Sequence, residues 1–285
     1  MSQLVLHPLT REQLDQFGTQ PPHAILLVGA AGSGKSALAT QLAETILELP
    51  PYDFDQYAYS TRIEPSDGKA IGIEAIRELE HFLSLKVPTR TAQNRLVIIE
   101  NAHTLTTEAQ NALLKTLEEP PKGTVLLLTA TSEQALLPTI RSRVQKIAVK
   151  RPLTDDIIQH FTARGHDQKA IKQAYGISGG LPGLMTALLE DSDHPLREAT
   201  EIARKLLGQN TYERLLMVDQ LSKQKTEAQD VLFILQQMAH VSLQTASGKV
   251  ADRWKAVLQA SYQASEQLAN SAQPKLALTN FVLYL

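Results

Sequence analysis

Short apolar runs alternate with amphipathic stretches over the first 150 residues of the chain. Runs of Leu and β-branched residues have the length of buried strands, and we expect strands at Ile25–Val28, Leu96–Ile99, Val125–Thr129 and Gln145–Val149. Segments that are apolar on both faces are typical of a parallel sheet covered by helices on both sides. Helical spacing appears between them, at Lys35–Leu47, at Gly72–Leu85 and from Thr106 to Pro120. The pattern predicts an α/β domain over residues 1–150.

Beyond Arg151-Pro152 the apolar spacing is helical throughout, so we expect only helices. Residues 151–194 form a small helical domain, interrupted at Gly179–Gly183, and residues 195–285 form a second helical domain of longer amphipathic helices. Turn-forming residues predict breaks near Gly208, Ser247-Gly248 and Pro274.

The composition narrows the classes of function. The formal net charge is −2, so any contact with nucleic acid must be local or made through partners. The chain has no Cys, which excludes disulfides and thiolate zinc sites. No apolar stretch approaches the roughly 20 residues that a membrane helix needs. We therefore expect a cytoplasmic protein without zinc.

A complete phosphate-binding loop of the pattern G-x-x-x-x-G-K-[ST] follows the first predicted strand. Glycines let the backbone bend so that successive N–H groups point at a triphosphate, and the next helix adds its positive end. Lys35 is expected to reach the β- and γ-phosphates, and the Ser36 hydroxyl to ligate Mg²⁺. The predicted ATP site comprises Gly29, Ala30, Ala31, Gly32, Ser33, Gly34, Lys35 and Ser36. The alternative is a loop that no longer binds nucleotide.

A second set of site residues follows two later strands. Glu100 ends the run Leu96–Ile99 and is expected to complete the Mg²⁺ shell, the alternative being a polar strand end without a metal. Asn101 stands where a carboxylate would polarise the attacking water, and an amide is a very poor proton acceptor. We therefore expect nucleotide binding with impaired hydrolysis. Thr131 is the candidate sensor of the γ-phosphate, by its spacing from Arg143, unless it belongs to a capped loop.

Several segments resemble the bacterial clamp-loader family of AAA+ proteins, and the likeness extends over the whole chain. They are Asn111–Pro121, Thr139–Val144, which matches a Ser-Arg-Cys motif with Val144 in place of the Cys, Ile71–Leu79, Phe82–Lys86 and Asn270–Leu278. The resemblance implies a P-loop AAA+ domain with a parallel sheet, followed by a small helical lid and an all-α collar that joins five subunits in a ring. That ring would load a sliding clamp on primed DNA. Lys86 and residues 90–95 form a modest basic segment that faces either DNA phosphates or solvent.

Within that family the chain is most similar to the stationary subunit rather than to the motors. Pro182 occupies the position of a motor arginine that contacts the γ-phosphate, and Pro supplies no charge or donor. Arg143 matches an arginine that reaches the ATP of a neighbouring subunit and stabilises the developing charge there. The alternative for Arg143 is a surface ion pair, and this is our interpretation of Arg141. One rival function is a self-sufficient AAA+ ATPase, which the intact loop favours. The other is a P-loop kinase, which would need a cluster of lid arginines that this chain lacks.

Overall fold

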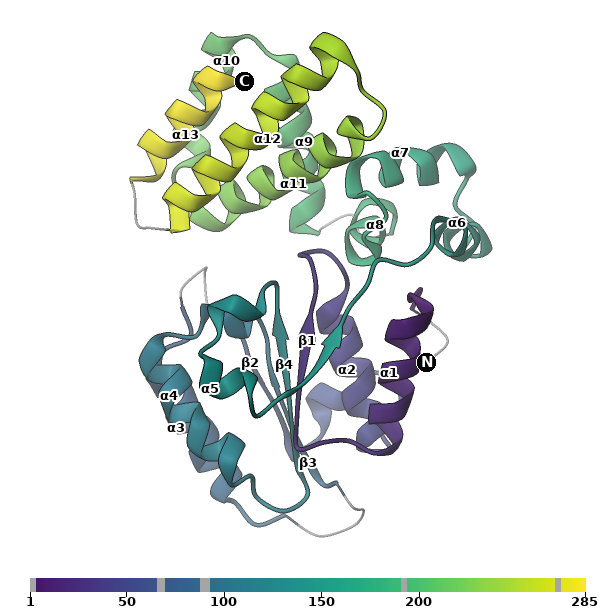
Figure 1. The fold of residues 1–285 in the computed structure, drawn as a ribbon, viewed down its shortest axis with the longest axis vertical. Coiled ribbons are helices and arrows are strands. Elements are labelled where there is room, and N and C mark those ends of the chain that lie inside the picture. The colour runs from purple at the N-terminus through teal and green to yellow at the C-terminus, as the bar shows by residue number, and fades with distance from the viewer. Residues whose placement is uncertain (1–3, 66–69, 88–92, 191–193, 270–272) are drawn as a thin grey trace. The chain divides into compact units, whose positions relative to one another are not determined.

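The computed structural model describes residues 4–65, 70–87, 93–190, 194–269 and 273–285. The chain divides into two compact units, Met1–Pro152 and Leu153–Leu285 (Figure 1). This division falls close to the boundary predicted at residue 150. The further boundary predicted between residues 194 and 195 stays a prediction. Residues 90–92 of the basic segment and 270–272 of the C-terminal motif lie outside the described residues.

The first unit is built on a five-stranded parallel sheet with the strand order β2-β3-β4-β1-β5. The four strands predicted from the sequence are confirmed, and β2 was missed. An edge position explains the omission, because all four residues of β2 are only half-buried and form no apolar run. The strands are β1 (Ala24–Val28), β2 (Ser60–Ile63), β3 (Arg95–Ile99), β4 (Thr124–Ala130) and β5 (Gln145–Ala148).

Helices cover both faces of this sheet (Figure 1). In β1, Ile25 and Leu27 face a cluster with α1 and α2, whereas Leu26 faces a cluster with α3, α4 and α5. Burying a large apolar side chain stabilises the fold by about 1.5–3 kcal/mol, so this alternation fixes the strand between its two layers. The helices are α1 (Pro8–Thr19), α2 (Lys35–Ile46), α3 (Ile73–Ser84), α4 (Thr107–Glu118) and α5 (Pro138–Arg141), with short 3-10 helices at Phe54–Gln56, Ala102–Thr104 and Glu133–Ala135.

The described part of the second unit is helical, as its spacing predicted. The helices are α6 (Thr154–Ala163), α7 (Gln168–Ser178), α8 (Pro182–Leu189), α9 (Pro195–Gly208), α10 (Thr211–Leu221), α11 (Lys225–Leu243), α12 (Gly248–Ala269) and α13 (Pro274–Tyr284). Predicted breaks coincide with their ends. The Asn210 side chain, for example, caps α10 in a reciprocal pair with Glu213. One apolar cluster extends from Ile177 in α7 to Val282 in α13.

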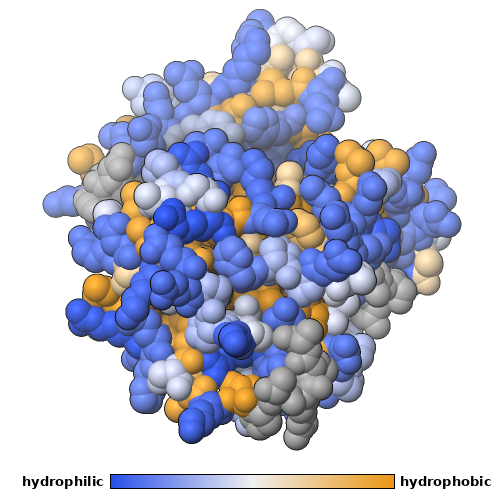
Figure 2. Space-filling view, turned by 60° about the horizontal axis from the view of Figure 1, so that its bottom comes forward, coloured by the Kyte–Doolittle hydropathy of each residue, from blue (hydrophilic) through white to orange (hydrophobic). Residues whose placement is uncertain are grey.

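Hydrophilic side chains predominate on the face of the molecule drawn in Figure 2, where hydrophobic ones occur only in small groups. A broad apolar patch, which would mark a large contact surface, is not seen on this face. Among the described helices, none combines the length and the apolar composition that crossing a bilayer requires.

Candidate nucleotide-binding site

The phosphate-binding loop joins β1 to α2 at the carboxyl edge of the sheet, in the strand-then-helix setting that its sequence predicted. Gly32 and Gly34 have φ angles of 71° and 83°, in the left-handed region where a Cβ is strained. At Gly29, a Cβ would lie 3.0 Å from both Cβ and O of Val149. Ala30, Ala31 and Ser33 occupy the intervening loop positions. The backbone therefore has a shape that requires glycine at these three positions.

Lys35 begins α2 and is buried, with 7% of its surface exposed. Its ammonium donates hydrogen bonds to the backbone carbonyls of Gly29 at 2.9 Å and Ala30 at 2.8 Å. Burial lowers the pKa of Lys35 to about 8, and the nearby carboxylate of Glu100 opposes this shift. The cation is thus held inside the loop by neutral acceptors, and an anionic phosphate would be a stronger partner.

Glu100 lies directly after β3 and connects the loop to a neighbouring strand. Its Oε2 accepts hydrogen bonds from Ser36 Oγ at 3.0 Å and from the Thr129 hydroxyl at 2.7 Å. The carboxylate is 5% exposed. The structure therefore brings Ser36 and Glu100 together, as the sequence predicted, and adds Thr129 of β4. Hydroxyl and carboxylate oxygens are hard donors of the kind that Mg²⁺ prefers, so these residues fit a nucleotide-bound magnesium ion.

Arg62 of β2 is a site residue that sequence reasoning missed. Its Nη1 lies 2.9 Å from Oε1 of Glu100, and its Nη2 donates to the hydroxyl of Thr40 at 2.9 Å. The guanidinium also packs over the ring of Phe54, 5.3 Å from its centroid, and contacts Asp55 at 3.3 Å. Both oxygens of Glu100 are consequently engaged by protein groups. No motif in the sequence marks Arg62, because its role arises only from the pairing of β2 with β3.

Asn101 adopts a left-handed backbone conformation with φ of 50°, which Asn tolerates better than most residues. Its backbone N–H donates to Thr129 Oγ1 at 2.9 Å, so the turn after β3 is tied to β4. Thr131 lies one residue beyond β4 and is exposed, and its backbone N–H donates to His103 Nδ1 at 3.4 Å. Burial and the charge of Lys35 lower the pKa of His103, which keeps this imidazole neutral at pH 7.

A cleft of about 240 Å³ opens at the carboxyl ends of β1, β4 and β5. Val28, Thr131 and Ala148 are among the residues that line it. The position of Thr131 beside the loop strand is compatible with the sensor role expected for it, which stays a prediction.

Arg143 lies on the surface of the first unit, with 35% of its side chain exposed. Its Nη2 pairs with Glu118 Oε1 at 2.7 Å, and its Nη1 donates to the backbone carbonyl of Thr139 at 2.9 Å. The guanidinium is neither buried nor joined to the phosphate loop of its own unit. Pro182, in the second unit, is the first residue of α8, where the fixed φ of Pro suits a helix start.

Together, the parallel sheet, the phosphate-binding loop after β1 and the acidic residue after β3 give the first unit the α/β fold of an AAA+ domain. Residues 11–152 match the family model described as DNA polymerase III, delta subunit. DNA polymerase III subunit delta′ of Pseudomonas aeruginosa is 32% identical over an alignment of 199 residues, and the match covers 62% of this chain and 59% of the relative. The chain is thus similar to the delta-prime subunits of DNA polymerase III.

A second relative and a solved structure extend the comparison. The delta-prime subunit of Escherichia coli is 29% identical over 192 residues, which cover 62% of this chain and 57% of that protein. The chain thus spans a little less than three fifths of the length of these two relatives. A DNA polymerase III gamma subunit-related protein of Thermotoga maritima shares the fold with a TM-score of 0.58 and 23% identity, over 95% of this chain and 97% of the other.

Proposed function

We propose that this chain is the stationary subunit of a clamp loader, which holds ATP and Mg²⁺ without hydrolysing ATP efficiently and lends Arg143 to a neighbouring motor subunit. The observation that carries this proposal is the composition of one edge of the sheet. Lys35, Ser36 and Glu100 meet there, while the next residue, Asn101, bears an amide.

Nucleotide binding is supported by the loop and by the charges around it. The backbone N–H groups of Gly29–Ser36 would hold the phosphates, and the Lys35 ammonium would exchange its carbonyl partners for phosphate oxygens. Ser36 and Glu100 would hold Mg²⁺, and a bound Mg²⁺ would neutralise part of the negative charge of the phosphates. Because Glu100 is paired with Arg62, coordination of the metal requires the carboxylate to share or exchange this partner.

Poor hydrolysis within the chain follows from the residue types at two positions. A general base must accept a proton from the attacking water, and the amide of Asn101 does this very poorly. Pro182 supplies no cation to the γ-phosphate from the second unit. The site therefore keeps the groups that bind nucleotide and lacks groups that would accelerate its cleavage.

Action on a neighbour is supported by the exposure of Arg143, whose contacts within its own unit are one half-exposed ion pair and surface acceptors. A guanidinium supplied across an interface stabilises negative charge that builds on the transferred phosphoryl group. The partners in this proposal are motor and delta-like subunits in a five-membered ring, and through them the sliding clamp and primed DNA.

The complete set of Lys35, Ser36 and Glu100 also favours a second candidate, a self-sufficient ATPase of the same fold. Measurements on the isolated chain separate the two. We expect it to bind a fluorescent ATP analogue with Mg²⁺, to lose this binding in Lys35→Ala, and to retain it in Lys122→Ala, which removes an exposed lysine of the same unit.

Hydrolysis is then measured for the chain alone and with motor subunits, clamp and primed DNA. We expect turnover only in the mixture. Steady turnover by the chain alone that Lys35→Ala abolishes would establish the second candidate instead, and failure to bind nucleotide would remove both.

A further inference from the structure

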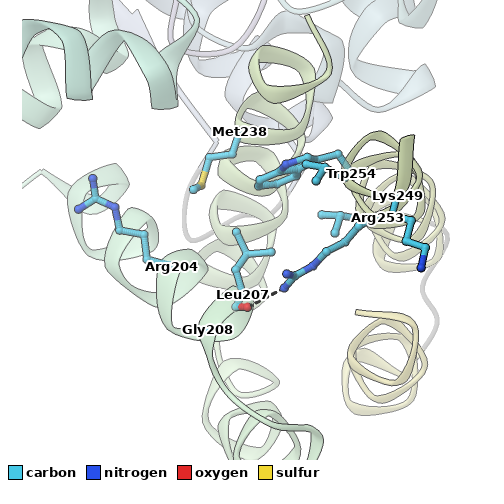
Figure 3. Close-up of a pocket in the computed structure, with 9 residues that line it drawn as sticks. Arg204, Leu207, Gly208, Met238, Lys249, Arg253 and Trp254 are labelled. Atoms are coloured by element: carbon cyan, nitrogen blue, oxygen red, sulfur yellow. Dashed lines mark hydrogen bonds between the residues drawn. The ribbon is translucent and has the colours of Figure 1, made fainter. Parts of the chain in front are cut away.

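A pocket of about 500 Å³ lies in the second unit between α9, α11 and α12, and none of its lining residues is assigned to nucleotide (Figure 3). Its interior is apolar: Leu207 of α9, Met238 of α11 and Trp254 of α12 point toward one another around it (Figure 3), and Val257 also lines it. These side chains also contact the main apolar cluster of the unit, so the walls are part of the folded core rather than a loose surface. An open pocket of this size with an apolar lining suits a bulky apolar side chain.

Cations surround this apolar interior. Arg204, Lys249 and Arg253 line the pocket and are exposed, with Arg204 and Lys249 on opposite sides of it in Figure 3. Within the described part of the chain, no carboxylate pairs with any of them. The chain as a whole has a net charge of −2, so this concentration of positive charge does not follow from a basic composition.

Arg253 is held in place by the end of α9. Its Nη2 donates to the backbone carbonyl of Leu207 at 3.0 Å, and Arg214 Nε donates to the adjacent carbonyl of Leu206 at 2.7 Å. Such contacts suit the negative end of a helix and explain why these two arginines are ordered. They do not explain Arg204 or Lys249, which have no comparable contact in the described structure. The exposed cations Arg204 and Lys249 are therefore available to anionic groups from outside the unit.

We propose that this pocket binds a short segment of a partner protein in which an apolar side chain is flanked by acidic residues. The apolar side chain would fill the space between Leu207, Met238 and Trp254, and the carboxylates would meet the cations at the rim. A single-stranded nucleic acid fits less well, because it has no aliphatic side chain for this interior and the lining contains only one aromatic ring on which a base could stack. This partner site shares no residue with the proposed nucleotide site and does not include Arg143.

Trp254 makes the proposal measurable without a label, because it is the only tryptophan of the chain. The probe is a capped synthetic peptide, Glu-Asp-Leu-Phe-Asp-Glu, titrated into the full chain while tryptophan emission is recorded. We expect a saturable change in intensity or wavelength. A peptide with Lys in place of every acidic residue should give none, and a peptide with Ser in place of Leu and Phe should bind at least about tenfold more weakly.

Charge-reversed variants test the rim. Arg204→Glu combined with Lys249→Glu should weaken binding of the acidic peptide by about tenfold or more, since both positions are exposed and the fold does not depend on them. Lys205→Glu is the matched control, because Lys205 is exposed on the same helix and does not belong to the described lining. Circular dichroism verifies that each variant keeps its helical content.

Three results would overturn the proposal. They are no saturable response to the acidic peptide, an equal response to its Lys counterpart, and an equal loss of binding in Lys205→Glu. A stronger response to an oligothymidylate than to the acidic peptide would also overturn it and would assign the pocket to single-stranded DNA.

Discussion

The guanidinium of Arg62 lies 2.9 Å from the carboxylate of Glu100, and it comes from the edge strand of the sheet. Glu100 is the acidic residue expected to serve a nucleotide-bound metal ion, yet its oxygens are shared among Arg62, Ser36 and Thr129. The chain therefore supplies its own counter-charge to this buried carboxylate.

Removing that counter-charge should destabilise the fold. Arg62→Ala leaves the buried carboxylate of Glu100 without this cation, so we expect the free energy of unfolding to fall by about 3 kcal/mol, at the low end for a buried pair because the Arg62 side chain is 21% exposed. Denaturant titration measures this change. The matched control is Arg77→Ala, which breaks a pair with Glu74 whose side chains are 65% and 75% exposed and should change stability by less than about 0.5 kcal/mol. Adding Glu100→Gln should restore much of the loss in Arg62→Ala, and an equal loss in the double variant would contradict this account.

Nucleotide affinity should depend on pH through Lys35, whose pKa burial lowers to about 8. Because a triphosphate binds the protonated form, we expect affinity for ATP to fall by up to about tenfold per pH unit above pH 8, measured by fluorescence titration. A flat affinity between pH 8 and 9.5 would contradict the assignment of Lys35 to the phosphates.

The same pKa has the opposite consequence for stability without nucleotide. Above about pH 8 the folded chain has released a proton that the unfolded chain keeps until about pH 10, so this lysine makes the free energy of unfolding rise across that interval. We expect Lys35→Met to lack this contribution. Denaturant titrations of the wild type and of Lys35→Met at about pH 8 and about pH 10 test this.

The ion pair between Arg143 and Glu118 must open if Arg143 acts on a neighbour. In the assembled complex, Arg143→Ala should lower ATP turnover by at least about tenfold, a small part of the effect of arginine fingers in GTPases. Arg141→Ala, an exposed arginine of the same segment, should leave turnover nearly unchanged. Glu118→Ala should keep or raise turnover, because it frees the guanidinium and removes a half-exposed pair worth only about 0–1 kcal/mol. Equal losses in Glu118→Ala and Arg143→Ala would mean that the pair itself matters.

The close approach at Gly29 predicts a steric defect. In Gly29→Ala the new Cβ would meet Val149 at 3.0 Å, so we expect a loss of about 1–3 kcal/mol in stability together with weaker nucleotide binding. Gly176→Ala is the control, since this glycine lies inside α7 and a Cβ there meets nothing within 4 Å. It should stabilise the fold by about 0.5–1 kcal/mol. Thermal unfolding compares the two variants.

The sequence predicted those parts of the site that belong to a strand or to the loop. Apolar runs located β1, β3, β4 and β5, and the loop pattern located Lys35 and Ser36. Glu100 could be found because it ends an apolar run. These signals are local, so they persist whatever the rest of the chain does.

The remaining site residues depend on how strands pair. The register of β3 and β4 places Ile99 beside Leu128, so the next residues along each strand, Glu100 and Thr129, meet. Spacing along the sequence gave Thr131, one residue beyond β4, as the γ-phosphate sensor; this stays a prediction, and spacing gave no sign of Thr129. Arg62 was missed for the same reason, since its strand is short, polar and half-buried.

One consequence of this arrangement concerns how the sheet comes apart. Among the described residues β2, like β5 at the other edge of the sheet, has a partner strand on one side only, and such a strand is prone to fraying. Arg62 of β2 pairs with the buried carboxylate of Glu100, so β2 cannot detach from the sheet without breaking this ion pair. Opening at this edge is therefore opposed by the loss of the ion pair with Glu100, a residue that also accepts a hydrogen bond from Ser36 beside the phosphate loop.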